Sequence, residues 1–270
     1  MSARIEQLGG VRCPRIVVSR RPRRSAGKLT LSLWQGVDWP AEVVPIDSAH
    51  RNPSATRLLD ALAAGNPSIR LKAALAIGTR PEPGLVDALV ARCAIEPDFF
   101  VRDMLTWALT RLPSEVTVPK LRAELRSGST QARSQALHTL SKIGDRDAWP
   151  AITSSLLRDA DDEVARSAWR AAVVLVPEGE QQVLATELAT QLGRGDREVR
   201  LSLSRALVAF GDVVEPVLRA AMTQHDPTVR AHAGATERLL RDPDAGFDLA
   251  VDEARRVFAL GLEGEEPPEC

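Results

Sequence analysis

The chain is poor in aromatic residues and in lysine. Only 4% of its 270 residues are aromatic, and tyrosine is absent altogether, which disfavours a β-sandwich with an aromatic-rich core. Its basic residues are almost all arginine, since Lys28, Lys72, Lys120 and Lys142 are the only lysines among 35 basic side chains. Together with abundant alanine, this excess of arginine over lysine indicates a GC-rich bacterial genome.

Paired cysteines and long apolar runs are also missing. Cys13, Cys93 and Cys270 are far apart and odd in number, so neither a disulfide framework nor a CxxC pair is available. The longest apolar stretches, such as 171–176, are far shorter than a membrane span, and the N-terminal part has no continuous apolar region of a signal peptide. These features predict a cytoplasmic protein that does not enter a membrane.

Charge is balanced overall but uneven along the chain. The 35 basic and 36 acidic residues leave a net charge of −1, which disfavours a protein dedicated to coating nucleic acid. Seven basic residues lie between Arg12 and Lys28, whereas nine acids and two arginines lie between Asp242 and Glu269. We expect residues 1–52 to be a basic, poorly ordered or loosely docked extension. One interpretation is a functional extension that binds nucleic acid or an acidic partner electrostatically. The other is a disordered tail without such a role, or a segment that results from a start codon assigned too far upstream.

From about residue 53 the sequence repeats itself, at spacings of roughly 30 to 35 residues. The recurring anchors are Ile69-Arg70, Val101-Arg102, Ala132-Arg133, Val164-Ala165, Val199-Arg200 and Val229-Arg230. Small or apolar residues recur four, seven and eleven positions after the anchors, with Arg80 the one exception. Such offsets mark one face of an α-helix, so each anchor predicts a helix with a buried stripe.

Residues typical of helix N-caps precede every one of these predicted helices. They lie in the segments Asn66-Pro67-Ser68, Pro97-Asp98, Ser129-Thr130, Asp161-Asp162, Gly195-Asp196 and Asp226-Pro227, whose side-chain oxygens can accept a free backbone N–H. Gly78, Gly144 and Gly211, among others, are candidate helix stops. A second apolar segment precedes each start, for example Ile152 to Leu156. The unit is therefore a helix, a short turn and a helix, repeated six times over residues 53–242.

Three segments carry a family resemblance: "DREVRLSLSRALVAFGD" at 196–212, "SGSTQARSQALHTLSKIGD" at 127–145 and "HDPTVRAHAGA" at 225–235. They resemble HEAT repeats, in particular the short bacterial subclass named after phycobilisome lyases. The resemblance implies an all-α, right-handed α-solenoid of about six helix pairs, followed by a capping helix and acidic tail in residues 243–270. Ala165 departs from the pattern, since it occupies the usual place of the arginine.

The recurring arginines, Arg70, Arg102, Arg133, Arg200 and Arg230, form the first candidate site. Their regularity favours a structural column, in which each arginine binds an acidic or carbonyl group of the adjacent unit. The acids just upstream, Asp98, Asp162, Asp196 and Asp226, are the expected partners. Phosphate binding is the alternative.

A second column lies six residues after each anchor, at Leu75, Trp107, His138, Arg170, Arg205 and Ala235. This offset is outside the buried stripe, so we expect these side chains to be partly exposed. Trp107, His138, Arg170 and Arg205 form a mixed aromatic and basic strip, which is the composition enriched at binding hot spots. The alternative is that Trp107 and nearby Trp169 fill gaps between repeats.

Signals for catalysis or metal binding are weak. His225 and His232 are seven residues apart but Pro227 separates them, and the sequence contains no HExxH, GxSxG, P-loop or GxGxxG motif. Cys93 follows Arg92 in an apolar segment and is expected to be a small buried residue rather than a nucleophile. We expect no catalytic residue, no metal and no cofactor.

A stack of helix pairs exposes equivalent positions in rows, which suits binding of an elongated partner. The sequence therefore predicts a monomeric, non-catalytic scaffold for protein–protein interaction in the bacterial cytoplasm, with an unknown protein partner. The main alternative is a nucleic-acid-binding protein similar to alkyl-base DNA glycosylases, for which Trp107, Trp149 and Trp169 would have to trap a base. A third possibility is an activity like that of the bilin lyases.

Overall fold

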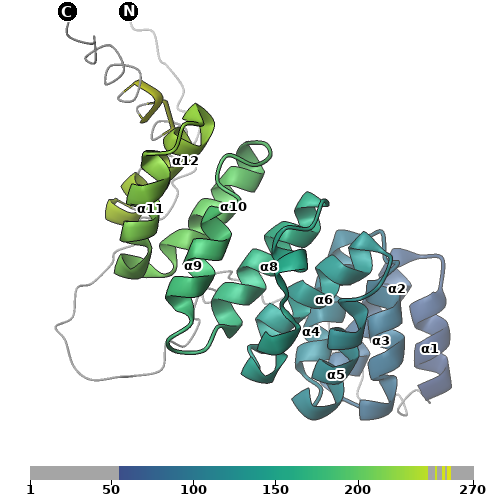
Figure 1. Ribbon diagram of the computed structural model, residues 1–270. Coiled ribbons are helices and arrows are strands. Elements are labelled where there is room, and N and C mark those ends of the chain that lie inside the picture. Colours follow the sequence, from purple (N-terminus) through teal and green to yellow (C-terminus); the bar gives the residue numbers. More distant parts are fainter. Residues whose placement is uncertain (1–54, 243–246, 248–250, 253, 257–270) are drawn as a thin grey trace, which may run out of the picture. The chain divides into compact units, whose positions relative to one another are not determined.

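The computed structural model describes residues 55–242, 247, 251–252 and 254–256, and these residues contain helices and turns but no β-strand. The helices form six consecutive pairs, here numbered repeats one to six (Figure 1). The first helices of the pairs are α1 (Ala55–Ala63), α3 (Val86–Cys93), α5 (Ser114–Glu124), α7 (Ser154–Leu157), α9 (Gln181–Ala189) and α11 (Glu215–Met222). The second helices are α2 (Pro67–Thr79), α4 (Phe99–Thr110), α6 (Thr130–Ile143), α8 (Asp162–Leu175), α10 (Arg197–Val208) and α12 (Pro227–Arg241).

The pairs stack into two layers. Each second helix contacts the second helix of the next repeat, from α2 through to α12, and the first helices contact one another from α1 to α5 and from α9 to α11 (Figure 1). A helix pair cannot bury its apolar face alone, so stacking completes the core. The prediction of an all-α solenoid built from six helix pairs is confirmed.

Every second helix begins where the sequence predicts. The side chains of Asn66, Asp98, Ser129, Asp161, Asp196 and Asp226 each accept a hydrogen bond from a backbone N–H in the first turn of the helix that follows. This satisfies donors that have no partner within the helix. The caps therefore set the register of all six second helices.

The predicted buried stripe is present, although Ile69 and Arg80 are exposed and several of its other members are only half-buried. Residues four positions after the anchors, such as Ala73, Leu105 and Ala168, are all buried. The first anchor, Ile69, is instead 46% exposed. An anchor packs against the preceding repeat, as Val229 does beside Gly193, and no described repeat precedes Ile69.

One predicted stop is wrong. Gly144 ends α6 in the left-handed conformation, with φ of 70°, as a C-terminal glycine commonly does. Gly78 instead lies inside α2, where it is buried. A Cβ atom at this position would lie 2.2 Å from Cζ3 of Trp107, so glycine is needed here for close packing of an indole and not for ending the helix.

Repeat four has a reduced first helix. Where the apolar segment near Ile152 predicts a regular helix, the chain forms a 3-10 helix, η2 (Arg146–Ala151), and the four-residue α7. Trp169 of α8 is fully buried, and its Nε1–H donates a 2.8 Å hydrogen bond to the carbonyl of Leu157 at the end of α7. A large side chain thus packs against the short helix.

The two predicted terminal regions lie largely outside the described residues. Residues 1–52 are entirely outside them, as is most of 243–270. Phe247 is described and packs with Ala235 and Leu239 of α12, while Val251 lies against the same small cluster. Apolar residues beyond α12 therefore extend the core, but the predicted capping helix as a whole stays a prediction.

Candidate interaction surface

A groove with a volume of about 240 Å³ crosses α4, α6 and α8 in the layer of second helices. It is lined by Phe99, Arg102, Asp103, Thr106, Ser134, Gln135, His138, Glu163, Ser167 and Arg170. Most of these side chains are polar. His138 and Arg170, two members of the predicted aromatic and basic strip, therefore lie in one groove.

Hydroxyl groups from three helices meet in this groove. Ser134 Oγ and Ser167 Oγ are 3.1 Å apart, and Arg170 Nη2 donates a hydrogen bond to Ser167 Oγ over 3.1 Å. Thr106 is only 3% exposed, yet its hydroxyl has no hydrogen-bond partner among the described residues. A buried hydroxyl without a partner costs free energy, so the groove has unused capacity to bind a polar group.

His138 contributes an uncharged ring. Burial, helped by the nearby charges of Lys142 and Arg170 and opposed by Asp103, lowers its pKa from 6.5 to about 4. The imidazole is therefore neutral at pH 7, and Arg170 with Arg102 supplies the positive charge of the groove. The strip is less basic than its sequence indicates.

The other members of the strip lie elsewhere. Trp107 is 37% exposed and packs against Gly78 of α2. Arg205 lines a separate pocket of about 430 Å³ together with Leu201, Val208, Leu239 and Phe247, among others. Ala235 is fully buried rather than partly exposed, because the cluster around Phe247 covers it. The residues of this column therefore do not form one continuous surface, because they lie in different grooves, in a packing contact or in the core.

The recurring arginines bind carbonyl groups in the turn before their own helix. Arg70 and Arg102 each donate from Nη1 to the carbonyls five and six residues upstream, at 2.8 to 2.9 Å. Arg230 repeats this arrangement, Arg133 binds the carbonyl of Ser127, and Arg200 that of Gly195. These carbonyls lie at or just beyond the C-terminal ends of first helices, where they lack helical partners, so the arginines act as caps within each repeat.

The upstream acids are not their partners, contrary to the sequence prediction. Asp98, Asp196 and Asp226 accept backbone N–H groups at the starts of helices instead. Two carboxylates among the described residues do pair with arginines of the column, and each comes from the following repeat, five residues before that repeat's anchor. Glu96 pairs with Arg70, and Asp159 pairs with Arg133 at 3.1 Å.

Glu96 is the centre of a buried charged cluster. Arg70 Nε and Nη2 each donate to its carboxylate over 2.7 Å, Arg92 Nε does so at 2.7 Å, and the N–H of Asp98 does so at 3.0 Å. Burial alone would raise the pKa of Glu96, but these hydrogen bonds outweigh it and lower the pKa to about 2. The cluster joins repeats one and two.

Repeat four obtains its arginine from its neighbour. Ala165 cannot bind the carbonyls upstream of α8, but Arg194, which precedes α10, donates from Nη2 to the carbonyl of Asp159. The same guanidinium pairs with Asp162 at 2.8 Å and lies 6.0 Å from the ring of Trp169. The departure at Ala165 is therefore compensated from the next repeat.

A second buried polar cluster joins repeats five and six and contains no charge. His232 Nδ1 accepts the N–H of Gly193, and its Nε2 lies 3.0 Å from both Ser204 Oγ and the carbonyl of Arg200. Thr236 Oγ1 lies 2.7 Å from Ser204 Oγ. Because Nδ1 accepts, the proton of the neutral ring sits on Nε2. Burial lowers the pKa of His232 to about 4.

Chemically reactive groupings are scarce in the described part of the chain. No cluster of three or more His, Cys, Asp or Glu suitable for a metal occurs there. Cys93 is buried, and burial together with Glu96 raises the pKa of its thiol to about 12. Its thiol is therefore protonated at neutral pH. The other tryptophans named for base capture are engaged, since Trp169 is buried and Trp149 donates to Glu180.

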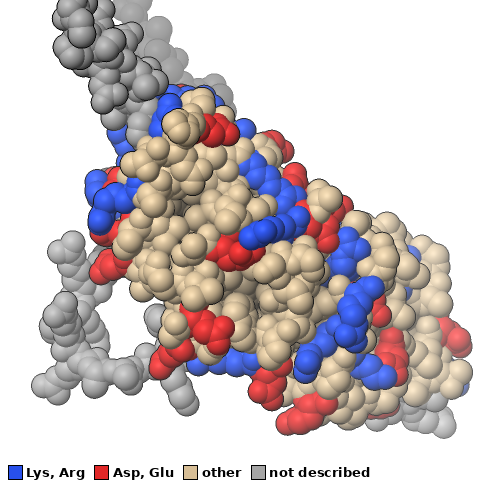
Figure 2. Space-filling view, in the orientation of Figure 1, with Lys and Arg blue, Asp and Glu red and all other residues tan. Residues whose placement is uncertain are grey.

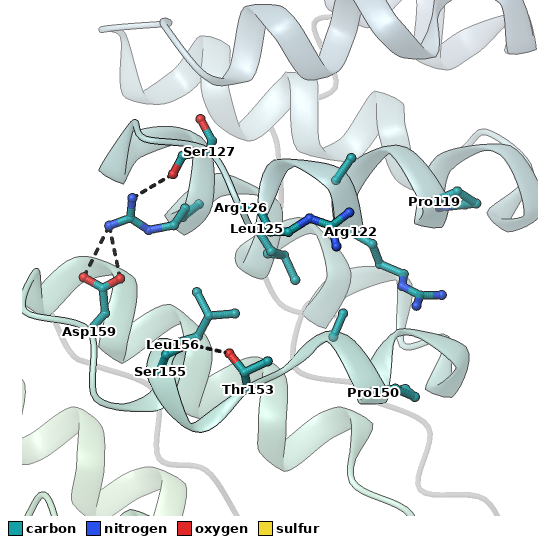
Figure 3. Close-up of a pocket in the computed structure, with 13 residues that line it drawn as sticks. Pro119, Arg122, Leu125, Arg126, Ser127, Pro150, Thr153, Ser155, Leu156 and Asp159 are labelled. Atoms are coloured by element: carbon teal, nitrogen blue, oxygen red, sulfur yellow. Dashed lines mark hydrogen bonds and ion pairs between the residues drawn. The ribbon is translucent and has the colours of Figure 1, made fainter.

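Another opening, which the sequence analysis missed, lies in the layer of first helices. Because α7 is short, a notch of about 570 Å³ separates α5 from the Pro150–Leu156 segment (Figure 3). Arg133, which lines the notch, binds Asp159 and the carbonyl of Ser127. Arg122 of α5 and Arg126, just beyond the end of α5, also line it (Figure 3). The sequence analysis took the segment from Ile152 to Leu156 as an apolar helix, although α7 itself has the sequence Ser-Ser-Leu-Leu.

Comparison with known proteins supports the repeat assignment for part of the chain. Residues 55–131 and 101–174 match the model of the family described as HEAT repeats. A crystal structure of an engineered protein is similar at 17% identity and a TM-score of 0.40, covering 72% of this chain and 100% of that one. No curated protein matches significantly. None of the described helices has both the length and the apolar character needed to cross a membrane.

Proposed function

We propose that the chain is a monomeric, non-catalytic HEAT-repeat adaptor of the bacterial cytoplasm that binds a protein partner through its second helices. The groove across α4, α6 and α8 is the centre of the proposed face, with Trp107 on one side and Arg205 on the other. The observation that carries the proposal is the hydroxyl of Thr106, buried in this groove without a partner.

The surroundings of Thr106 indicate what the partner would present. Phe99, at 65% exposure, offers an apolar ring at the groove, and Arg170 offers a cation. A segment with an apolar side chain, a hydrogen-bonding group for Thr106 and an acidic group for Arg170 would match all three. Burying an exposed aromatic ring beside a matched charge is how interface hot spots gain affinity.

The distribution of charge favours a protein partner over nucleic acid. Figure 2 shows small blue and red groups on the visible face, separated by uncharged surface. Nucleic-acid binding proteins rely on a continuous basic surface that neutralises phosphates. Such a surface would also need the recurring arginines, which instead bind backbone carbonyls.

Affinity purification of the tagged chain, followed by quantitative mass spectrometry, tests the proposal. The double variant Phe99→Ala with Arg170→Glu should lose a partner that the wild-type chain retains. Lys72→Glu reverses one charge in the same way at an exposed position of α2, and this variant should retain the partner. A partner held equally by all three proteins would contradict the groove assignment, and steeply salt-dependent recovery of DNA would favour the nucleic-acid alternative.

Trp107→Ala and Arg205→Glu define how far the face extends. If the partner spans several repeats, each of these changes should weaken retention less than the groove variant does, because each residue lies outside the groove. Thr106→Val keeps the shape of the side chain and removes its hydroxyl. It should weaken partner binding and leave the fold unchanged, since no described residue hydrogen-bonds to that hydroxyl.

A further inference from the structure

The notch between repeats three and four has a composition that the adaptor function does not explain. Arg122 lies in the last turn of α5 and Arg126 lies just beyond its C-terminal end; both are exposed and make no ion pair with a described residue. Two like charges on neighbouring turns of the chain repel each other. Arg133, the third arginine at the notch, has its charge balanced by Asp159, the one carboxylate among the lining residues.

The remaining lining supplies two further kinds of contact. Ser127, Thr153 and Ser155 provide hydroxyl groups, and Thr153 Oγ1 lies 2.8 Å from Ser155 Oγ. Pro119, Pro150 and Leu156 provide an apolar wall. The Nε–H of Arg133 is buried and has no partner in the described structure. Unbalanced guanidinium groups together with hydroxyl donors are suited to an oxyanion with several acceptor oxygens.

We propose that this notch binds a small organic phosphate. Its phosphoryl group would lie between Arg122 and Arg126, where it would relieve their mutual repulsion, and its organic part would lie against the prolines. A volume of about 570 Å³ is within the range of pockets that hold small molecules. This site is on the opposite helix layer from the proposed partner groove, so either proposal can fail without the other.

Isothermal titration calorimetry of the full chain with ADP, inorganic pyrophosphate and a phosphoserine peptide tests the site. ADP is expected to bind, and Arg122→Glu with Arg126→Glu should weaken it by about tenfold or more, because two charge-assisted donors are lost. The matched control is Arg57→Glu with Lys72→Glu, which makes the same change in net charge away from the notch. It should leave the affinity unchanged.

The outcomes separate the possible sources of the phosphate. Tighter binding of ADP than of pyrophosphate supports a small organic phosphate, whereas binding of the phosphoserine peptide alone would overturn that assignment in favour of a modified protein. If the Arg122/Arg126 and Arg57/Lys72 double variants weakened ADP binding equally, the effect would come from overall charge, and the proposed site would be wrong. Ala123→Trp fills the notch without changing charge, so unchanged ADP affinity in that variant would also overturn it.

Discussion

Two buried polar clusters join neighbouring repeats at opposite ends of the solenoid, and they differ in charge. Glu96, with Arg70 and Arg92, joins repeats one and two through ion pairs. His232, with Ser204 and Thr236, joins repeats five and six through neutral hydrogen bonds. The comparison shows that neighbouring repeats can be joined by either charged or neutral buried groups, provided that these groups have hydrogen-bond partners.

The largest effect is expected from breaking the charged cluster. Glu96→Ala leaves Arg70 and Arg92 without the carboxylate that both bind, and Arg70 is only 5% exposed. Removing one partner of a buried ion pair costs about 3–5 kcal/mol. Urea unfolding should show a decrease of this size in the free energy of unfolding. A decrease below about 1 kcal/mol would contradict the structural role of the cluster.

Acid should weaken the neutral junction first. The pKa of His232 is about 4 in the folded chain against an ordinary 6.5, so the unfolded chain binds more protons and stability falls as the pH drops from 6.5 to 4. The loss is of the order of 3 kcal/mol. The Glu96 cluster loses stability only in the lower window, from its ordinary pKa of 4.5 to about 2.

Hydrogen exchange at pH 4.5 to 5 measures this difference along the chain. Amides of α10 and α12 should lose protection before those of α2 and α4. The pKa of His138 is lowered to about 4 as well, so His138→Gln serves as the reference in which the contribution of that ring is removed. His232→Gln should flatten the pH dependence at repeats five and six, and earlier opening of repeats one and two would contradict the comparison.

A smaller loss of stability is expected when Arg194 of repeat five no longer binds the turn of repeat four. Arg194→Ala leaves the carbonyl of Asp159 without its donor, and an unsatisfied buried acceptor costs about 1–3 kcal/mol. Ala165→Arg restores the arginine at the position used by the other repeats. The double variant should recover part of the lost stability in a double-mutant cycle, and strict additivity of the two losses would argue against compensation.

The smallest effect is expected at an exposed ion pair. Lys120 and Asp87 link α5 to α3 at 2.8 Å, but their side chains are 49% and 72% exposed. Exposed pairs contribute less than about 1 kcal/mol. Asp87→Ala should therefore change the urea midpoint only slightly, and a loss comparable to that of Glu96→Ala would show that burial does not distinguish the two kinds of junction.

The sequence predicted the features that depend on neighbouring residues. The helix pairs and the starts of all six second helices follow from spacing and from the capping chemistry of short polar residues, and the structure confirms them. The partners of the arginines were mispredicted because a carboxylate at an N-cap is already used by its own helix. Contacts such as Arg70 with Glu96 depend on how repeats stack, which is not visible in local spacing.

The candidate groove was predicted only in part for the same reason. His138 and Arg170 are recognisable as polar residues outside the apolar stripe, and both line the groove. Thr106, Ser134 and Ser167 looked like ordinary small residues of closely packed helices, and only the packed structure shows one hydroxyl without a partner. The notch was missed because Ile152 and Leu156 were taken as the apolar face of a regular helix, whereas only the four residues of α7 are α-helical there.

The guanidinium of Arg194 also bears on how such a chain can change in length. Repeat arrays grow and shrink by duplication or loss of whole units, and each unit must carry its own caps to be exchanged alone. Repeats one, two, three, five and six meet this condition through their own arginines. Repeat four does not, so a copy of repeat four placed without repeat five behind it would lack the arginine that binds its turn.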